Sequence, residues 1–278
     1  MKGIDCATPI SAKAAQIIKS EGYDFAGRYL VPFSLSKAIK EEEAENILRA
    51  GLGLLLVWEI EAARIRRGAD VGRADGENAR ALARMIGVPA GTIIYFAADY
   101  AVPPEDYGLV EEYLRAASAG LGEYGCGVYG HYALIEAMNA RDVCRGYWQC
   151  VAWSGGMHSP ARTVYQALWS GADECKALAA KVGFDVDIDY CPDMERAGFW
   201  LPEAEEKKDE PAASEKRYNT MAELPDWAKA TIQDLIAKGC IQGSGTAYDA
   251  DGNPADMDLS HDMIRLLVMN DRAGVYKD

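Results

Sequence analysis

The sequence has few of the residues by which nucleophilic and metal-dependent enzymes are usually recognised. It contains three histidines among 278 residues, and its seven cysteines form no C-x-x-C pair. Because histidine and closely spaced cysteine are the usual zinc ligands, a zinc site is not expected. G-x-S-x-G and Cys/His/Asn patterns are also missing, as is a Gly-rich phosphate loop. The sequence therefore predicts no metal and no cofactor.

Long apolar runs and excess positive charge are lacking as well. No stretch approaches 18 consecutive apolar residues, so no membrane insertion is expected. With 43 acidic against 29 basic residues, the net charge of −14 argues against nucleic acid as a partner. The odd number of cysteines, mostly within apolar segments, indicates free buried thiols in a chain folded in the cytoplasm, and the first residues lack the apolar core of a signal peptide.

What the sequence does contain is a regular alternation of two kinds of segment. Short β-prone apolar runs alternate with amphipathic stretches whose apolar residues recur every three or four positions, several of which end on glycine. Eight strands with interleaved helices imply a parallel sheet, and eight is the number that closes a (β/α)8 TIM-like barrel. An open doubly wound sheet is the alternative. The strands are predicted at 2–5, 25–30, 52–59, 92–99, 126–130, 147–153, 162–168 and 185–190.

A charged segment divides the chain. Residues 203–217, EAEEKKDEPAASEKR, have no apolar side chain larger than alanine and are typical of a solvated linker. We therefore expect a barrel over residues 1–202, a linker over 203–217 and a small, mostly helical domain over 218–278.

Several predicted strands end on acids. Asp5, Glu59 and Asp99 are the last residues of the first, third and fourth predicted strands, and Asp187 or Asp189 ends the eighth. In a parallel barrel these ends meet at one mouth, where crowded carboxyls shift one another's pKa values apart. Glycoside hydrolysis needs such a set: one carboxyl as proton donor and another as base, nucleophile or electrostatic stabiliser. Capping of the following helices is the alternative role for each acid.

Other side chains are predicted to line this mouth and bind substrate. Tyr129 and Trp148 are candidate platforms for sugar rings, although most aromatic residues pack in cores. Gln149 and Gln166 are candidate partners for sugar hydroxyls. Arg28, at the end of the second strand, is expected to pair with Asp5 or Glu59 and keep that carboxylate ionised.

Five motifs in order, KGIDCA, FAGRYL, IYFAADY, GVYG and VDIDY, carry a family resemblance over about residues 1–200. Together they resemble a glycoside hydrolase-like domain of bacterial and phage proteins, related to the family-25 lysozymes that cut peptidoglycan. The resemblance implies a TIM-like barrel with Asp5, Asp99 and Asp187 or Asp189 as catalytic carboxylates and Glu59 as a compensating acid. It departs from the lysozyme pattern at Ala97, which stands where the first acid of a D-x-E pair is expected.

The C-terminal region resembles an S-layer-homology module. The resemblance rests on LPDWAKATIQDLIAKGCIQG, the turn-rich YDADGNPADMDLS and the final HDMIRLLVMN. This implies binding of secondary cell-wall polymers; a dimerisation appendage is the alternative. The whole sequence thus predicts an endolysin-type hydrolase, made in the cytoplasm and acting on bacterial peptidoglycan after release, with Asp99 as proton donor. A non-catalytic glycan-binding protein, or an amidase or transglycosylase, remains the alternative, and the oligomeric state is not fixed by sequence.

Overall fold

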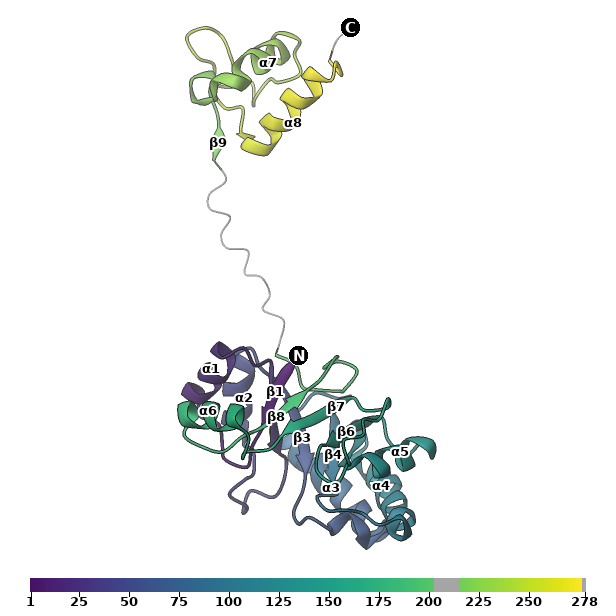
Figure 1. Cartoon of the computed structure of the whole chain (residues 1–278). Helices are drawn as coiled ribbons and strands as arrows, with labels where there is room; N and C mark the ends of the chain where they lie inside the picture. Colours follow the sequence, from purple (N-terminus) through teal and green to yellow (C-terminus); the bar gives the residue numbers. More distant parts are fainter. Residues whose placement is uncertain (203–215, 277–278) are drawn as a thin grey trace. The chain divides into compact units, whose positions relative to one another are not determined.

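A computed structural model describes residues 1–202 and 216–276 of the chain (Figure 1). The chain divides into two compact units, Met1–Ala204 and Glu205–Asp278. Most of the predicted linker, residues 203–215, lies outside the described residues. Arg217, which the sequence analysis placed in the linker, belongs to strand β9 of the second unit.

The first unit is a closed barrel of eight strands in sequential order. All eight strands lie where the apolar runs predicted them, within a few residues at the ends. They are β1 (Lys2–Asp5), β2 (Phe25–Tyr29), β3 (Gly53–Trp58), β4 (Ile93–Ala97), β5 (Gly125–Gly130), β6 (Gly146–Cys150), β7 (Val164–Leu168) and β8 (Asp187–Tyr190).

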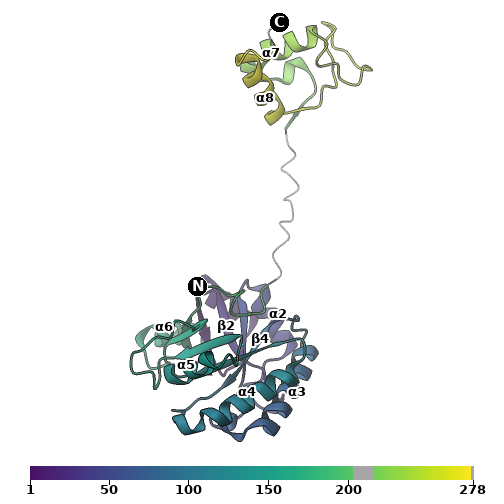
Figure 2. The same cartoon turned by 90° about the vertical axis from the view of Figure 1, so that its right-hand side faces the viewer.

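Helices pack around much of this barrel and connect most of its strands (Figure 2). The amphipathic stretches predicted five of them, whereas α5 was not singled out from the sequence. They are α1 (Ala12–Ser20), α2 (Glu41–Arg49), α3 (Ala69–Met85), α4 (Tyr107–Leu121), α5 (Tyr132–Ala140) and α6 (Asp173–Val182), with short 3-10 turns η1 (Arg64–Arg67) and η2 (Pro104–Asp106). Residues 151–163, between β6 and β7, contain no helix.

The last strand of the barrel runs against the others. Strands β1 to β7 pair in parallel, but β8 pairs antiparallel with both β7 and β1. The prediction of a parallel sheet throughout was therefore wrong for β8. An apolar run has the same pattern in either direction, and the helix α6 before β8 resembles a crossover that would return the chain to a parallel strand. Strand β8 consequently starts, rather than ends, at the end of the barrel where β1 finishes.

Alternation along the strands separates an inner from an outer layer. Inward side chains such as Phe25, Tyr95 and Trp148 fill the barrel in one buried cluster, and a larger cluster packs between the strands and the helices. The segment after β8 covers the amino-terminal end of the barrel, where Phe199 packs edge-on against Phe25 at a centroid distance of 4.9 Å. This closed end is the floor, and the opposite end, where β1 to β7 finish, is the mouth.

Helices α3 and α4 lie side by side outside the barrel in both views (Figures 1 and 2). Glycines make this approach close: a Cβ on Gly72 would lie 2.2 Å from the backbone oxygen of Tyr113, and one on Gly76 would lie 2.2 Å from that of Ala117. Side chains at these two positions would force the helices apart.

We expect Gly72→Ala to lower the free energy of unfolding by about 1–3 kcal/mol, because the new methyl group overlaps backbone rather than a movable side chain. Urea denaturation monitored by circular dichroism measures it. Gly108→Ala in α4 is the matched control, since a Cβ there meets nothing within 4 Å. That change should leave stability the same or raise it by about 0.5 kcal/mol. Equal effects at both positions would contradict the close helix packing.

The second unit is small and mostly helical, in line with the sequence analysis. It comprises β9 (Arg217–Tyr218), the 3-10 turn η3 (Met221–Glu223), α7 (Asp226–Ala237), β10 (Leu259–Ser260) and α8 (His261–Arg272). Strands β9 and β10 pair antiparallel, and Ile232, Leu235 and Ile264 lie in the core between the helices. In the described ranges, every helix is too short or too polar to span a lipid bilayer.

All seven cysteines are free thiols, as the sequence predicted. Six are buried, and Cys240 in the second unit is exposed.

Candidate active site

Three carboxyls from two neighbouring strands meet at the mouth of the barrel. Asp5 is the last residue of β1, and its partner in the register is Asp187, the first residue of β8. Asp189 lies two positions further along β8, so its side chain points to the same inner face. The predicted convergence of these acids is therefore found, but for β8 it results from the antiparallel direction of the strand. In a parallel β8 the first residue would have been at the floor.

Gln166 of β7 joins two of these carboxyls to the barrel wall. Its Nε2 donates to Asp5 Oδ2 at 2.7 Å and to Asp187 Oδ2 at 3.1 Å. Its Oε1 accepts a hydrogen bond from the Tyr129 hydroxyl at 2.8 Å. The two carboxyls fix the orientation of the amide, because only its nitrogen can donate to them, and its oxygen is then left to accept from the phenol. Gln166 and Tyr129 thus lie at the mouth as predicted. Gln166 donates hydrogen bonds to carboxyl groups of the protein itself.

Asp189 is fully buried beneath these groups. Its Oδ1 accepts a hydrogen bond from Trp148 Nε1 at 2.8 Å, while Oδ2 finds no donor among the described residues. The Asp5 carboxyl lies within hydrogen-bonding contact of the Asp189 carboxyl, and two ionised carboxylates cannot bond to each other. Burial, together with the charge of Asp5, raises the pKa of Asp189 well above its usual range. We therefore assign the proton of this contact to Asp189, which donates a hydrogen bond that Asp5 accepts.

The same crowding acts on the other two carboxyls. Burial raises the pKa of Asp5, while the hydrogen bonds from Gln166 and Asp189 oppose that rise. Burial and then repulsion from Asp5 raise the pKa of Asp187 to about 7, against a lowering hydrogen bond from the backbone of Ser170. Asp187 is only partly buried, so it combines contact with solvent and a proton retained near neutral pH.

Two further predicted acids form the rim of the mouth. Glu59 follows β3 and pairs with Lys37 at 3.3 Å between Oε1 and Nζ. Asp99 follows β4 and is exposed; partial desolvation and then the charge of Glu59 raise its pKa, and Lys37 opposes this. Asp5, Glu59, Asp99 and Asp187 all lie near enough to Tyr29 to raise the pKa of its phenol, in addition to the effect of burial. The five predicted acids are therefore gathered around one mouth.

Three of the predicted substrate-binding residues are not at the mouth. Arg28 points outward from β2 and pairs with Glu43 of α2 at 2.6 Å between Nε and Oε1, so the predicted pair with Asp5 or Glu59 was wrong. Alternation explains this, because Gly27 and Tyr29 occupy the inward positions on either side.

Gln149 also faces outward, from β6. It is fully buried and braces the loop after the strand: its Nε2 donates to the Met157 carbonyl at 2.8 Å, and its Oε1 accepts from the Ser159 backbone at 2.8 Å. Trp148 does face inward, but it lies below the mouth at 1% exposure, with its ring edge-on to Tyr129 at 5.0 Å. It serves Asp189 as a hydrogen-bond donor and has no exposed face for a sugar.

Three residues of this site were not predicted from the sequence. Tyr29 was detectable, because it lies two positions after the inward Gly27 on the same strand. Lys37 lies in the loop between β2 and α2, where no periodicity predicts the direction of a side chain. Trp169 follows β7 and is 65% exposed, and its neighbour Ser170 is bonded through its backbone to Asp187. Its position directly after a strand, where residues of the mouth are expected, was the available signal.

A closed eight-stranded barrel with clustered carboxyls at its mouth has the architecture of a glycoside hydrolase-like domain. Residues 16–191 match the family described as Rv2525c-like, glycoside hydrolase-like domain, and the chain belongs to this family.

Solved structures agree with this fold. The Tat-secreted protein Rv2525c of Mycobacterium tuberculosis superposes with a TM-score of 0.62 at 23% identity, over 72% of this chain and 98% of that one. A protein of B. stearothermophilus superposes with a TM-score of 0.53 at 20% identity, over 72% of this chain and all (100%) of that one.

In sequence, FadG of Bacillus subtilis (strain 168) is 30% identical over 149 residues, which cover 51% of this chain. The chain spans about a quarter (25%) of the length of FadG.

Proposed function

We propose that this protein is a glycoside hydrolase directed at peptidoglycan. The observation that carries the proposal is the carboxyl cluster of Asp5, Asp187 and Asp189, in which neighbouring acids differ in their affinity for a proton. Cleavage of a glycosidic bond needs one carboxyl that still holds its proton and another that is ionised. Such a pair at the mouth of a barrel provides both groups within reach of one sugar linkage.

We assign the proton-donor role to Asp187 rather than to Asp99. Asp187 is partly exposed at the mouth, and its pKa of about 7 keeps it protonated in mildly acidic conditions. Asp5 is the ionised partner, because Gln166 and Asp189 both donate hydrogen bonds to it. Glu59 and Asp99 lie at the rim, and the positive charge of Lys37 acts on both of them. These residues would orient the sugar and the attacking water.

The second unit and the linker fit the same proposal. An S-layer-homology-type module that binds a secondary wall polymer would keep the barrel near its substrate and raise the local concentration of glycan. In this reading the protein acts at the bacterial cell wall after release from the cytoplasm.

Digestion of purified peptidoglycan followed by mass spectrometry tests the proposal. A hydrolase of this class creates new reducing ends, and Asp187→Asn should remove them. Free peptides would instead identify an amidase, and anhydro sugars a transglycosylase. Binding without any product would identify a glycan-binding protein, the reading that Ala97 favours because it replaces an acid on the fourth strand.

Trp169 gives a separate prediction about substrate binding. Its ring is 65% exposed, and the next residue, Ser170, bonds through its backbone to Asp187. We therefore expect the ring to offer an apolar face to the C–H groups of a sugar, so that Trp169→Ala raises KM about three- to tenfold with little change in kcat. Steady-state kinetics on soluble peptidoglycan strands measures both constants. Leu109→Ala, which removes an exposed apolar side chain of α4, is the control and should change neither. A fall in kcat alone would contradict a binding role.

A further inference from the structure

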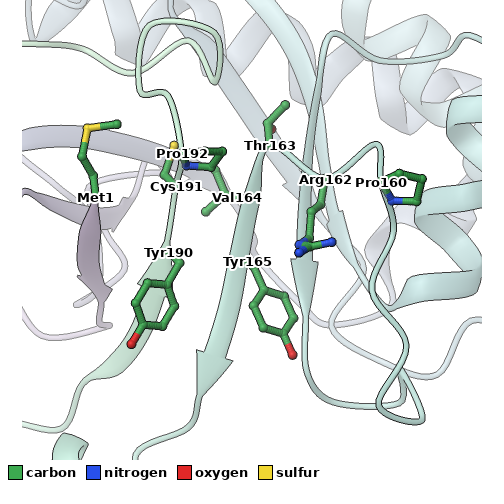
Figure 3. A pocket seen from close by; sticks show the side chains of 9 residues that line it. All are labelled: Met1, Pro160, Arg162, Thr163, Val164, Tyr165, Tyr190, Cys191 and Pro192. Carbon is green, nitrogen blue, oxygen red and sulfur yellow. The ribbon is translucent and has the colours of Figure 1, made fainter.

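A hollow on the barrel unit lies away from the mouth, on the outer side of β7 and β8 (Figure 3). Because residues 151–163 form no helix, this part of the sheet lacks the helical cover that the other connections provide. The hollow measures about 630 Å³, a size typical of sites for small ligands. It is lined by Met1, Pro160, Arg162, Thr163, Val164, Tyr165, Tyr190, Cys191 and Pro192.

Two tyrosines form the wall of this groove. Tyr165 and Tyr190 are register partners across the antiparallel pair of β7 and β8, and Figure 3 shows their rings side by side. Their neighbours Gln166 and Asp189 point inward, so alternation directs both tyrosines outward. Tyr190 is 43% exposed, and the ring of His158 packs edge-on against Tyr165 at 4.8 Å. The groove therefore presents adjacent aromatic faces with polar edges, which suit a ligand that has both C–H faces and hydroxyl groups.

Arg162 adds a positive charge to the same groove. Its guanidinium carbon lies 5.5 Å from the centroid of the Tyr165 ring, and its Nη1 donates to the Ser159 carbonyl at 2.6 Å. Across the described ranges 1–202 and 216–276, Arg162 forms no ion pair with a carboxylate. An uncompensated, partly buried guanidinium is notable in a chain of net charge −14, and it favours an anionic group in the ligand.

We propose that this groove is a second glycan-binding site, which takes a strand of sugars bearing carboxylates. The sugar rings stack on Tyr165 and Tyr190, and a carboxylate of the strand bonds to Arg162. The proposal rests on the proposed glycan-directed function, but it concerns a surface separate from the acid cluster. A strand held on this face keeps the enzyme on its polymer between cleavage events, whatever occupies the mouth.

Calorimetric titration of the full chain tests this site with two probes of equal length. One is peptide-free peptidoglycan backbone, whose muramic acid residues carry free carboxylates, and the other is chitohexaose, which carries none.

Tyr190→Ala should weaken binding of the acidic strand about tenfold or remove one binding site per chain, whereas Tyr190→Phe, which keeps the ring, should bind as the wild type does. Arg162→Gln should weaken binding of the acidic strand about tenfold and leave chitohexaose binding unchanged, and Arg162→Lys should restore part of the difference. Arg49→Gln, at an exposed arginine of α2, should have no effect.

Superimposable titrations for wild type, Tyr190→Ala and Arg162→Gln would overturn the proposal. So would concentration-dependent dimerisation that Tyr190→Ala abolishes, because the groove would then accept a second copy of the chain. Kinetics on a short soluble substrate should be unchanged in both variants, which separates this site from the mouth. If peptidoglycan digestion yields no product, the hydrolase proposal fails while these binding differences remain measurable.

Discussion

Asp187→Asn is expected to lower kcat for peptidoglycan hydrolysis about 10²- to 10⁴-fold, because the variant has no proton to give to the leaving oxygen. In the wild type, activity should fall as pH rises through about 7, where Asp187 loses its proton. The sign follows from the role: a general acid is active in its protonated form, so the limb that reports it lies on the alkaline side. Measurement of kcat between pH 4 and 9 shows both effects.

Asp185→Asn is the matched control for this experiment. Asp185 is an exposed acid two positions before Asp187, and its charge contributes slightly to the raised pKa of that group. This variant should retain kcat and move the alkaline limb a little toward lower pH. Two results would mean that the proton donor is another group. One is wild-type activity in Asp187→Asn. The other is an alkaline limb that stays at its wild-type pH in both Asp185→Asn and Asp187→Asn.

The second large effect concerns stability. In the folded state Asp187 and Asp189 hold protons at pH values where an unfolded chain, with an aspartate pKa of about 3.9, has released them. Between about pH 4 and 7 the native state therefore binds more protons than the unfolded state. The free energy of unfolding should fall as pH rises through this window, by at most about 1.4 kcal/mol per pH unit for each such group.

Asp189→Asn should remove much of this dependence. The asparagine amide reproduces the protonated carboxyl, because its oxygen can accept from Trp148 and its nitrogen can donate to Asp5. Near pH 4 the variant should be about as stable as the wild type, and at pH 7 it should be the more stable of the two, because it has no proton to lose. Urea denaturation at several pH values measures the difference. Asp193→Asn, at an exposed site after β8, should follow the wild type throughout; an Asp189→Asn curve parallel to the wild type would mean that Asp189 holds no proton.

Local pattern was enough to predict the positions of the strands and which acids lie around the mouth. A buried strand must be apolar, and an acid such as Asp99 directly after one is conspicuous in sequence. The direction of β8 was not predictable, because strand direction depends on which neighbours close the barrel. The acids nevertheless met, because Asp187 starts β8 at the same end where Asp5 finishes β1.

Partners of individual side chains were harder to predict. Alternation from Gly27 and Tyr29 would have placed Arg28 on the outer face. Its partner Glu43 lies on a helix 15 residues further along the chain, and only packing brings the two together. Trp148 was assigned to the ligand as an aromatic platform for a sugar ring, and Gln149 as a hydrogen-bond partner for sugar hydroxyls. The structure supplies protein partners for both: the loop after β6 and the carboxyl of Asp189.

The reversed last strand also decides where the chain leaves the barrel. Tyr190 at the end of β8 pairs with Lys2 at the start of β1, and Trp200 then pairs with Leu54 near the start of β3. The backbone thus departs from behind the floor, whereas a parallel eighth strand would have released it among the acids. A reporter or a surface anchor fused after Pro202 would attach to this rear side, so a barrel immobilised in this way would keep its mouth open to bulk solution.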